Sequence, residues 1–346
     1  MAHPKYAHVP GGIQTINLAL QGGGSHGAFT WGVLDALLED GGFRFAGISG
    51  TSAGAMNAAV LASGFADARE LGIADVHEEH ARGCELARQK LRHFWETVGT
   101  LGSFLAASPA SYAHQLMPWL RPVLAPSQVN PLDINPLRTL LKRTVEFEKL
   151  VQHRKHPNVP KVFVCATNVR TGRGEVFCDE RITIDAIMAS ACLPQLFHPI
   201  EIDGECYWDG GFAGNPAIYP LIYRTHIDDV LLVQINPIEI QNLPVSMSEI
   251  QERINEVTFN ASLLAELRAI EFVQRLIEEG RVEKGRYKYM RMHRIDGGAL
   301  LQTFGSDTKM RTDIGFLQRL CAQGRESAHT WLEENRQYIG VRPTMK

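Results

Sequence analysis

Short apolar runs alternate with longer segments of helical periodicity in the first part of the chain. Residues 15–21 (TINLALQ) and 43–49 (FRFAGIS) are apolar runs with the length of buried strands. Residues 28–39 carry an apolar stripe and residues 53–62 consist mostly of small helix formers, so both segments predict helices. This order predicts a doubly wound α/β domain, in which active groups gather at the carboxyl ends of the strands.

The rest of the chain continues the mixed pattern with a larger share of helix. Short apolar runs predict further strands at 161–166, 199–207 (a hairpin with an Asp-Gly turn) and 287–295. Helical spacing predicts long helices at 77–95, 246–279 (one or two helices) and 313–338. Residues 101–131 are rich in proline and bulky apolar residues. They predict a core-packing loop and helix, a cap over an apolar channel, or both.

A serine between two glycines follows the second predicted strand, in residues 50–54 (GTSAG). A Gly-x-Ser-x-Gly turn between strand and helix can hold its serine in a strained conformation, because glycines leave room for the backbone to double back. The same pattern also occurs in ordinary strand-to-helix loops. Ser52 is therefore a candidate nucleophile, and this segment alone leaves both interpretations open.

A second glycine-rich loop, residues 22–27 (GGGSHG), follows the first predicted strand. A dinucleotide-binding loop would need a carboxylate at the end of the second strand, and a phosphate-binding P-loop would need a lysine; neither is present. Consecutive glycines can instead point two backbone N–H groups at one place, beside a helix N-terminus that favours negative charge. An oxyanion hole is therefore the interpretation that fits best.

A serine nucleophile needs a base, and the best candidate is Asp209. It lies in residues 207–212 (YWDGGF), directly after the predicted hairpin. Asp-Gly is also the commonest turn pair, so a simple turn residue is the alternative. The histidines further along the chain, His226, His293 and His329, do not lie in a glycine-containing loop at a strand end.

The composition agrees with a globular enzyme and lacks the excess of basic residues that is typical of proteins that bind nucleic acid. The chain has 346 residues and a net charge of −3. Its first residues lack the apolar core of a signal peptide, and no apolar run approaches the roughly 20 residues that span a bilayer. Six cysteines without Cys-x-x-Cys spacing predict reduced thiols in the cytoplasm. His77 and His80 lack further ligands, so we expect no metal and no cofactor.

These motifs together resemble the patatin-like phospholipase family. Residues 21–27 (QGGGSHG) are similar to its oxyanion loop, residues 50–54 to its nucleophile elbow, and Asp209-Gly210-Gly211 to its catalytic aspartate motif. The continuation Asn215-Pro216 and the segments 166–172 and 189–199 agree as well. The resemblance implies a three-layer α/β/α fold with a mainly parallel sheet. It implies a catalytic domain over 14–237 with a helical cap insertion at about 72–150, and a mainly helical extension over 238–346 packed on the same domain.

The resemblance also implies roles for individual residues. Ser52 would be the nucleophile and Asp209 the general base of a Ser–Asp dyad, with burial raising the pKa of Asp209. The oxyanion hole would comprise Gly22, Gly23 and Gly24, and the supporting residues would be His26, Gly27, Gly50, Gly54, Gly210 and Gly211. Two positions depart from the family pattern. Asn168 stands where aspartate is frequent, and His26 stands where the family usually has arginine or lysine. A histidine there would be charged only below about its ordinary pKa of 6.5, which predicts pH-dependent catalysis.

The function that the resemblance implies is a serine esterase or lipid acyl hydrolase of phospholipase A type, working through an acyl-enzyme. Two alternatives stay open: an acyltransferase or hydrolase of non-lipid esters such as thioesters or hydroxyalkanoate oligomers, and a non-catalytic interaction protein with the same fold. The expected partner is a lipid or other acyl-ester substrate. Transient membrane-surface contact and a homo-oligomer are compatible with the long apolar helical stripe after residue 246, and no nucleic acid is expected.

Overall fold

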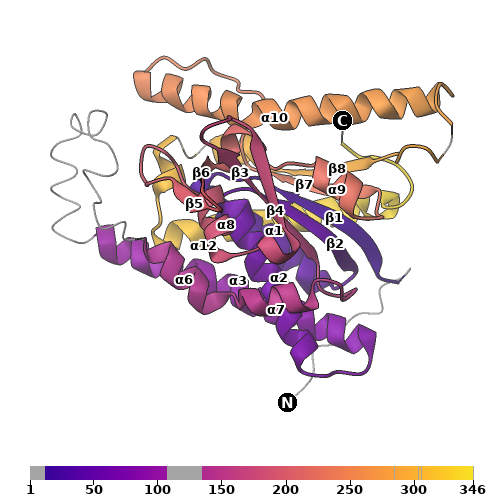
Figure 1. The fold of residues 1–346 in the computed structure, drawn as a ribbon. Coiled ribbons are helices and arrows are strands. Elements are labelled where there is room, and N and C mark those ends of the chain that lie inside the picture. Colours follow the sequence, from indigo (N-terminus) through magenta and orange to yellow (C-terminus); the bar gives the residue numbers. More distant parts are fainter. Residues whose placement is uncertain (1–11, 107–134, 284, 303, 305, 346) are drawn as a thin grey trace.

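A central sheet with helices on both faces forms the protein (Figure 1). The computed structural model describes residues 12–106, 135–283, 285–302, 304 and 306–345. Within them the sheet has eight strands in the order β5-β6-β3-β2-β1-β7-β8, and β4 pairs with β3 outside this path. The strands are β1 (Gln14–Leu20), β2 (Phe43–Gly50), β3 (Lys161–Asn168), β4 (Gly174–Cys178), β5 (Ile200–Ile202), β6 (Glu205–Asp209), β7 (Asp229–Gln234) and β8 (Arg291–Asp296).

The strands β3, β2, β1, β7 and β8 run parallel. Strands β4 and β6 pair with β3 in antiparallel orientation, and β5 pairs with β6 in antiparallel orientation. Strand β1 contributes Ile16, Leu18 and Leu20 to one core cluster and Ala19 to the other. Successive side chains of a strand point to opposite faces, so the two clusters lie on opposite faces of the sheet. Apolar residues on both faces are typical of a parallel sheet between two helical layers.

Two layers of helices cover these faces. One cluster packs against α1 (Gly27–Asp40), α2 (Ala53–Glu70), α3 (Val76–Ala106), α6 (Pro136–Thr144), α7 (Phe147–His153), α8 (Ile184–Ser190) and α12 (Ile314–Asn335). The other packs against α9 (Tyr219–Arg224) and α10 (Met247–Glu278), and Figure 1 shows α10 crossing the sheet on its own side. A short helix, α11 (Gly298–Gln302), follows β8. The predicted three-layer α/β/α fold with a mainly parallel sheet is confirmed.

Local sequence signals explain where the helices begin and end. The first residues of α10 form a capping box: Ser246 Oγ accepts from the N–H of Glu249 at 3.2 Å, and the Glu249 carboxylate accepts from the N–H of Ser246 at 2.8 Å. Helix α1 ends at Asp40 and is capped by Gly41, which adopts a φ of 68° in the left-handed region. A Cβ on Gly27 would lie 2.6 Å from Ala53 Cβ, so this glycine lets α1 and α2 begin in close contact.

The predicted elements are present, with differences mainly in length. Helices α2 and α3 extend well beyond the segments predicted at 53–62 and 77–95, and the segment predicted at 246–279 is a single helix. The last predicted strand begins at Arg291 and not at Tyr287. Strands β4 and β7 were not predicted. Most of the apolar segment 101–131, and with it the expected cap, lies outside the described residues. The described parts of 72–150 are mostly helical, and α3 buries its apolar face in the helical layer.

Candidate active site

Ser52 lies in a strained turn between β2 and α2. Its φ of 55° and ψ of −122° are unusual for a residue that is not glycine. A Cβ on Gly50 would lie 2.5 Å from the Gly54 carbonyl oxygen, and a Cβ on Gly54 would collide with the Leu20 carbonyl. Both glycines are therefore required by the close return of the backbone. The turn predicted from residues 50–54 has the geometry of a nucleophile elbow.

Strands β2 and β6 bring Ser52 and Asp209 together because they meet end to end along one edge of β3. Strand β4 occupies the opposite edge. Strand β2 runs parallel to β3 and ends at Gly50, opposite Val164. Strand β6 approaches from the other direction and ends at Asp209, opposite Ala166. The residues after β2 therefore face the end of β6, where the Ser52 side chain lies close enough to the Asp209 carboxylate to lower its pKa.

Asp209 is almost completely enclosed, with 2% of its surface exposed. Its Oδ1 accepts from the N–H of Gly211 at 2.7 Å, its own N–H donates to the Cys192 carbonyl at 2.7 Å, and its carbonyl accepts from Thr167 Oγ1 at 2.8 Å. Burial raises the pKa of Asp209 to about 7, although the hydrogen bond from Gly211 and the nearby Ser52 side chain oppose this rise. The burial expected from the sequence is present, and the raised pKa that follows from it makes the carboxylate a stronger base than an exposed aspartate.

The glycine loop lies directly against the elbow. A Cβ on Gly22 would lie 2.7 Å from Ser52 Cβ. The N–H of Gly22 already donates to Asn215 Oδ1 at 2.7 Å, so Gly22 holds the loop and is not available as an oxyanion donor. Within the part of the chain that the structure describes, the N–H groups of Gly23 and Gly24 donate to no other group. Gly24 has a φ of 58° and opens the short helical turn that leads into α1. Two N–H groups beside a helix N-terminus are thus free to bind an anion near Ser52.

A family comparison covers the part of the chain that contains these motifs. The model of the patatin-like phospholipases matches residues 18–222, more than half of the chain and a span that contains the elbow, the glycine loop and Asp209. The chain belongs to the patatin-like phospholipase family. Membership of this family supports lipid acyl hydrolase activity.

Two solved structures are similar to this patatin-like chain at low identity. VipD from Legionella pneumophila is 16% identical, with 92% of this chain and 67% of VipD covered and a TM-score of 0.40. The other is the heterodimeric ExoU–SpcU complex from the type III secretion system of Pseudomonas aeruginosa. It is 17% identical, with 93% of this chain and 52% of the matched chain covered and a TM-score of 0.34. This chain thus spans about half of the latter. No curated protein matches the chain.

His26, the unusual residue of this patatin-like loop, is a buried neutral histidine. Its Nε2 lies 2.9 Å from Thr308 Oγ1. Burial, together with the positive charge of Lys309, lowers the pKa of His26 to about 3. The prediction that His26 becomes the titrating cation of the loop near its ordinary pKa is therefore wrong, because the imidazole stays neutral at any pH where the enzyme would work.

Sequence reasoning missed the buried amides that hold the glycine loop. Asn236 Nδ2 donates to the Gly22 carbonyl at 2.7 Å. Gln21 Oε1 accepts from the N–H groups of Ile235 and Asn236 at 2.9 and 2.8 Å. The sequence holds one usable signal: Gln21 directly precedes the loop, and a polar residue at a buried strand end needs partners. Asn236 also follows a strand, β7, but that strand was itself missed.

The remaining candidate residues lie in supporting or separate positions. Ser190 Oγ accepts from the N–H of Ser52 at 2.9 Å, and no sequence pattern indicated this contact. The backbone carbonyl of Cys192 accepts the N–H of Asp209, and its thiol donates to the His198 carbonyl at 2.9 Å. His293 bonds Asp229 and Thr344, away from the elbow. No helix in the described segments is both long and apolar enough to cross a membrane.

Proposed function

We propose that the protein hydrolyses acyl esters of lipids with a Ser52–Asp209 dyad. One observation carries the proposal: the side chain of Ser52 lies beside the buried carboxylate of Asp209, whose pKa of about 7 makes it a base near neutral pH. The adjacent N–H groups of Gly23 and Gly24 supply the second requirement of acyl transfer, a place for the oxyanion. Among the described residues, no histidine contacts Ser52 or Asp209, which supports a dyad over a triad.

Acylation begins when Ser52 Oγ attacks the ester carbonyl carbon and its proton passes to Asp209. The carbonyl oxygen becomes an oxyanion and accepts hydrogen bonds from the N–H groups of Gly23 and Gly24, with further stabilisation from the N-terminus of α1. As the tetrahedral intermediate collapses, the proton on Asp209 moves to the leaving alcohol oxygen. The alcohol departs, and the acyl group remains on Ser52 as an ester.

Deacylation repeats these steps with water as the nucleophile. Water gives one proton to Asp209 and attacks the acyl carbon, which again forms an oxyanion at the glycine loop. Collapse returns the proton from Asp209 to Ser52 Oγ and releases the carboxylic acid. Gly50 and Gly54 shape the elbow for this chemistry, and the N–H of Gly211 orients the Asp209 carboxylate.

The same dyad would also serve acyl transfer, or hydrolysis of thioesters and hydroxyalkanoate oligomers. The family assignment favours lipid esters. The intact dyad and glycine loop speak against a protein that only binds partners. A cytoplasmic location, the division into 14–237 and 238–346, and a homo-oligomer stay predictions. The first of these is supported by six free cysteines.

Hydrolysis of short p-nitrophenyl esters tests the dyad. We expect Ser52→Ala and Asp209→Asn each to lower kcat at least about 10²–10⁴-fold while retaining the circular dichroism spectrum. Ser327→Ala, on α12, is the matched control and should keep the wild-type rate. Near wild-type hydrolysis by purified Ser52→Ala would refute the proposal. A panel of phospholipids, thioesters and hydroxyalkanoate oligomers, run with the same variants, then separates the alternatives.

A further inference from the structure

The glycine loop is supported from behind by the C-terminal part of the chain. A Cβ on Gly23 would lie 2.9 Å from Ile235 Cδ1, and a Cβ on Gly24 would collide with the carbonyl oxygen of Lys309. A cavity of about 1070 Å³, lined in part by His26, Ile235 and Lys309, lies on this side of the loop. The loop therefore has Ser52 on one side and a cavity on the other, so a few contacts decide its position.

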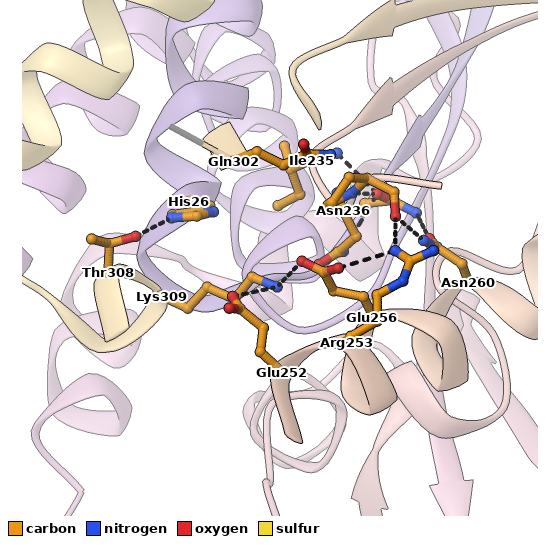
Figure 2. Close-up of polar contacts among 12 residues, drawn as sticks. His26, Ile235, Asn236, Glu252, Arg253, Glu256, Asn260, Gln302, Thr308 and Lys309 are labelled. Carbon is orange, nitrogen blue, oxygen red and sulfur yellow. Dashed lines mark hydrogen bonds and ion pairs between the residues drawn. The ribbon is translucent and has the colours of Figure 1, made fainter. Parts of the chain in front are cut away.

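Thr308 and Lys309, which we call the bracket, make two of these contacts. Figure 2 shows Thr308 Oγ1 against His26 Nε2, at 2.9 Å, with both side chains buried. The second contact is the Lys309 carbonyl, which lies so close to Gly24 that a Cβ there would be 2.3 Å from its oxygen. His26 lies between Gly24 and the start of α1, so the first contact fixes the end of the loop and the second fixes its middle.

The bracket is itself anchored to α10 by ion pairs. Lys309 Nζ lies 3.6 Å from Glu256 and 3.8 Å from Glu252 (Figure 2). Glu256 is buried and also pairs with Arg253 at 3.1 Å. Arg253 in turn donates to the carbonyl of Ile238, in the segment that follows β7, at 2.7 Å. Ion pairs thus hold Lys309 to α10, and the neighbouring Thr308 joins the same segment to His26 of the glycine loop.

We propose that the bracket positions the N–H groups of Gly23 and Gly24 for the oxyanion, with Thr308 as a positioning residue that acts through His26. The bracket and α10 lie outside the span that the family model matches, residues 18–222. The C-terminal part of the chain therefore belongs to the catalytic machinery and is more than a packing extension. This inference rests on the proposed acyl-ester hydrolysis.

The expected consequence is a loss of turnover without a loss of substrate binding. Oxyanion donors act on charge that develops only in the transition state, so misplacing them lowers kcat and leaves KM almost unchanged. Removing one donor outright lowers kcat about 10²–10³-fold. A glycine loop that has lost the contact between Thr308 and His26 is displaced only part of the time, so we expect kcat to fall less, by about tenfold.

Steady-state ester hydrolysis by Thr308→Val, Thr308→Ser and the control Thr330→Val tests the bracket. Valine keeps the shape of threonine and removes the hydroxyl, serine keeps the hydroxyl, and Thr330 is an exposed threonine on α12. The active sites in each sample are counted by the amount of fluorophosphonate bound. We expect kcat per active site to fall about tenfold in Thr308→Val, with KM within about twofold of the wild-type value. Thr308→Ser should restore most of the lost kcat, and Thr330→Val should keep the wild-type kcat.

The possible outcomes separate this inference from the proposed function. Absence of Ser52-dependent hydrolysis in the wild type contradicts the proposed function. If the wild type is active and Thr308→Val keeps the wild-type kcat per active site, the inference that the bracket positions the loop is overturned. The same holds if Thr308→Val loses only thermal stability. If Thr308→Val does not fold, Lys309→Met takes its place. It should lower kcat by loosening the anchor on α10, and wild-type kcat per active site would equally overturn the inference.

Discussion

Replacing Asp209 by asparagine should stabilise the fold while it removes the activity. The burial that makes Asp209 a base also penalises its charged form, and raises its pKa from 3.8 to about 7. Asparagine has no charge to bury, and its Oδ1 can still accept the N–H of Gly211. The active site therefore carries a cost in stability that this substitution should remove.

The size and sign of the effect follow from proton linkage. Between pH 4 and pH 7 the folded protein keeps a proton on Asp209 that the unfolded chain has lost, so the free energy of unfolding falls by about 1.4 kcal/mol for each pH unit. The accumulated cost near pH 8 is about 4 kcal/mol as an upper bound, and close to zero near pH 4. We therefore expect Asp209→Asn to be more stable than the wild type by about 2–4 kcal/mol near pH 8, and by little near pH 4.

Urea unfolding of both proteins near pH 8 and pH 4 measures this difference. The remaining carboxylates titrate alike in the two proteins and cancel. Asp203→Asn is the matched control, because Asp203 is an exposed hairpin residue with a φ of 54° that asparagine tolerates. It should change stability by less than about 0.5 kcal/mol at either pH. No stabilisation of Asp209→Asn near pH 8, or the same stabilisation at both pH values, would refute a buried carboxylate with a raised pKa.

Three further predictions concern catalysis. Activity requires ionised Asp209, so kcat/KM should be half-maximal near pH 7, fall about tenfold per pH unit below it and level off above; a flat pH–rate profile would contradict this. His26→Gln should keep the inflection near pH 7, because His26 is neutral there, and its disappearance would restore a titrating role for the histidine. Gly24→Ala should lower kcat at least about tenfold, because the added Cβ would push the loop away from Lys309. Gly172→Ala is the control: Gly172 also has a positive φ but lies in open space, so this variant should keep the wild-type kcat. Equal kcat values in the two variants would show that the contact between Gly24 and Lys309 is unimportant for catalysis.

The fold could be predicted where the chain alternates regularly and not where tertiary contacts decide. The two opening strand–helix units were predictable because their strands are apolar on both faces and end in glycine loops. Strand β4 was not, because its residues 174–178 (GEVFC) are short and partly exposed, and pairing with β3 makes them a strand. The helix predicted to end at Trp95 continues to Ala106 in α3, through Gly99 and Gly102, which have low helix propensity.

The chemistry of the site was more predictable than its support. Ser52 and Asp209 stand in glycine-containing motifs that a sequence reader can recognise, because strained turns restrict residue type. The bracket has no such motif: Thr308 approaches His26 only because η5 (Ser306–Met310) packs against the loop, at a distance of 282 residues along the chain. The same packing overturned the expected role of His26, since burial and not residue type sets its pKa.

The most direct test of the central claim is the site of covalent labelling by a fluorophosphonate, located by peptide mass spectrometry. The account predicts stoichiometric labelling of Ser52 in the wild type, no labelling in Ser52→Ala, and labelling slowed at least about 10²-fold in Asp209→Asn, because the serine loses its base. Loss of ester hydrolysis should follow the labelled fraction. Labelling at another residue, or full hydrolytic activity after Ser52 is occupied, would contradict the assignment of Ser52 and Asp209 as the catalytic dyad.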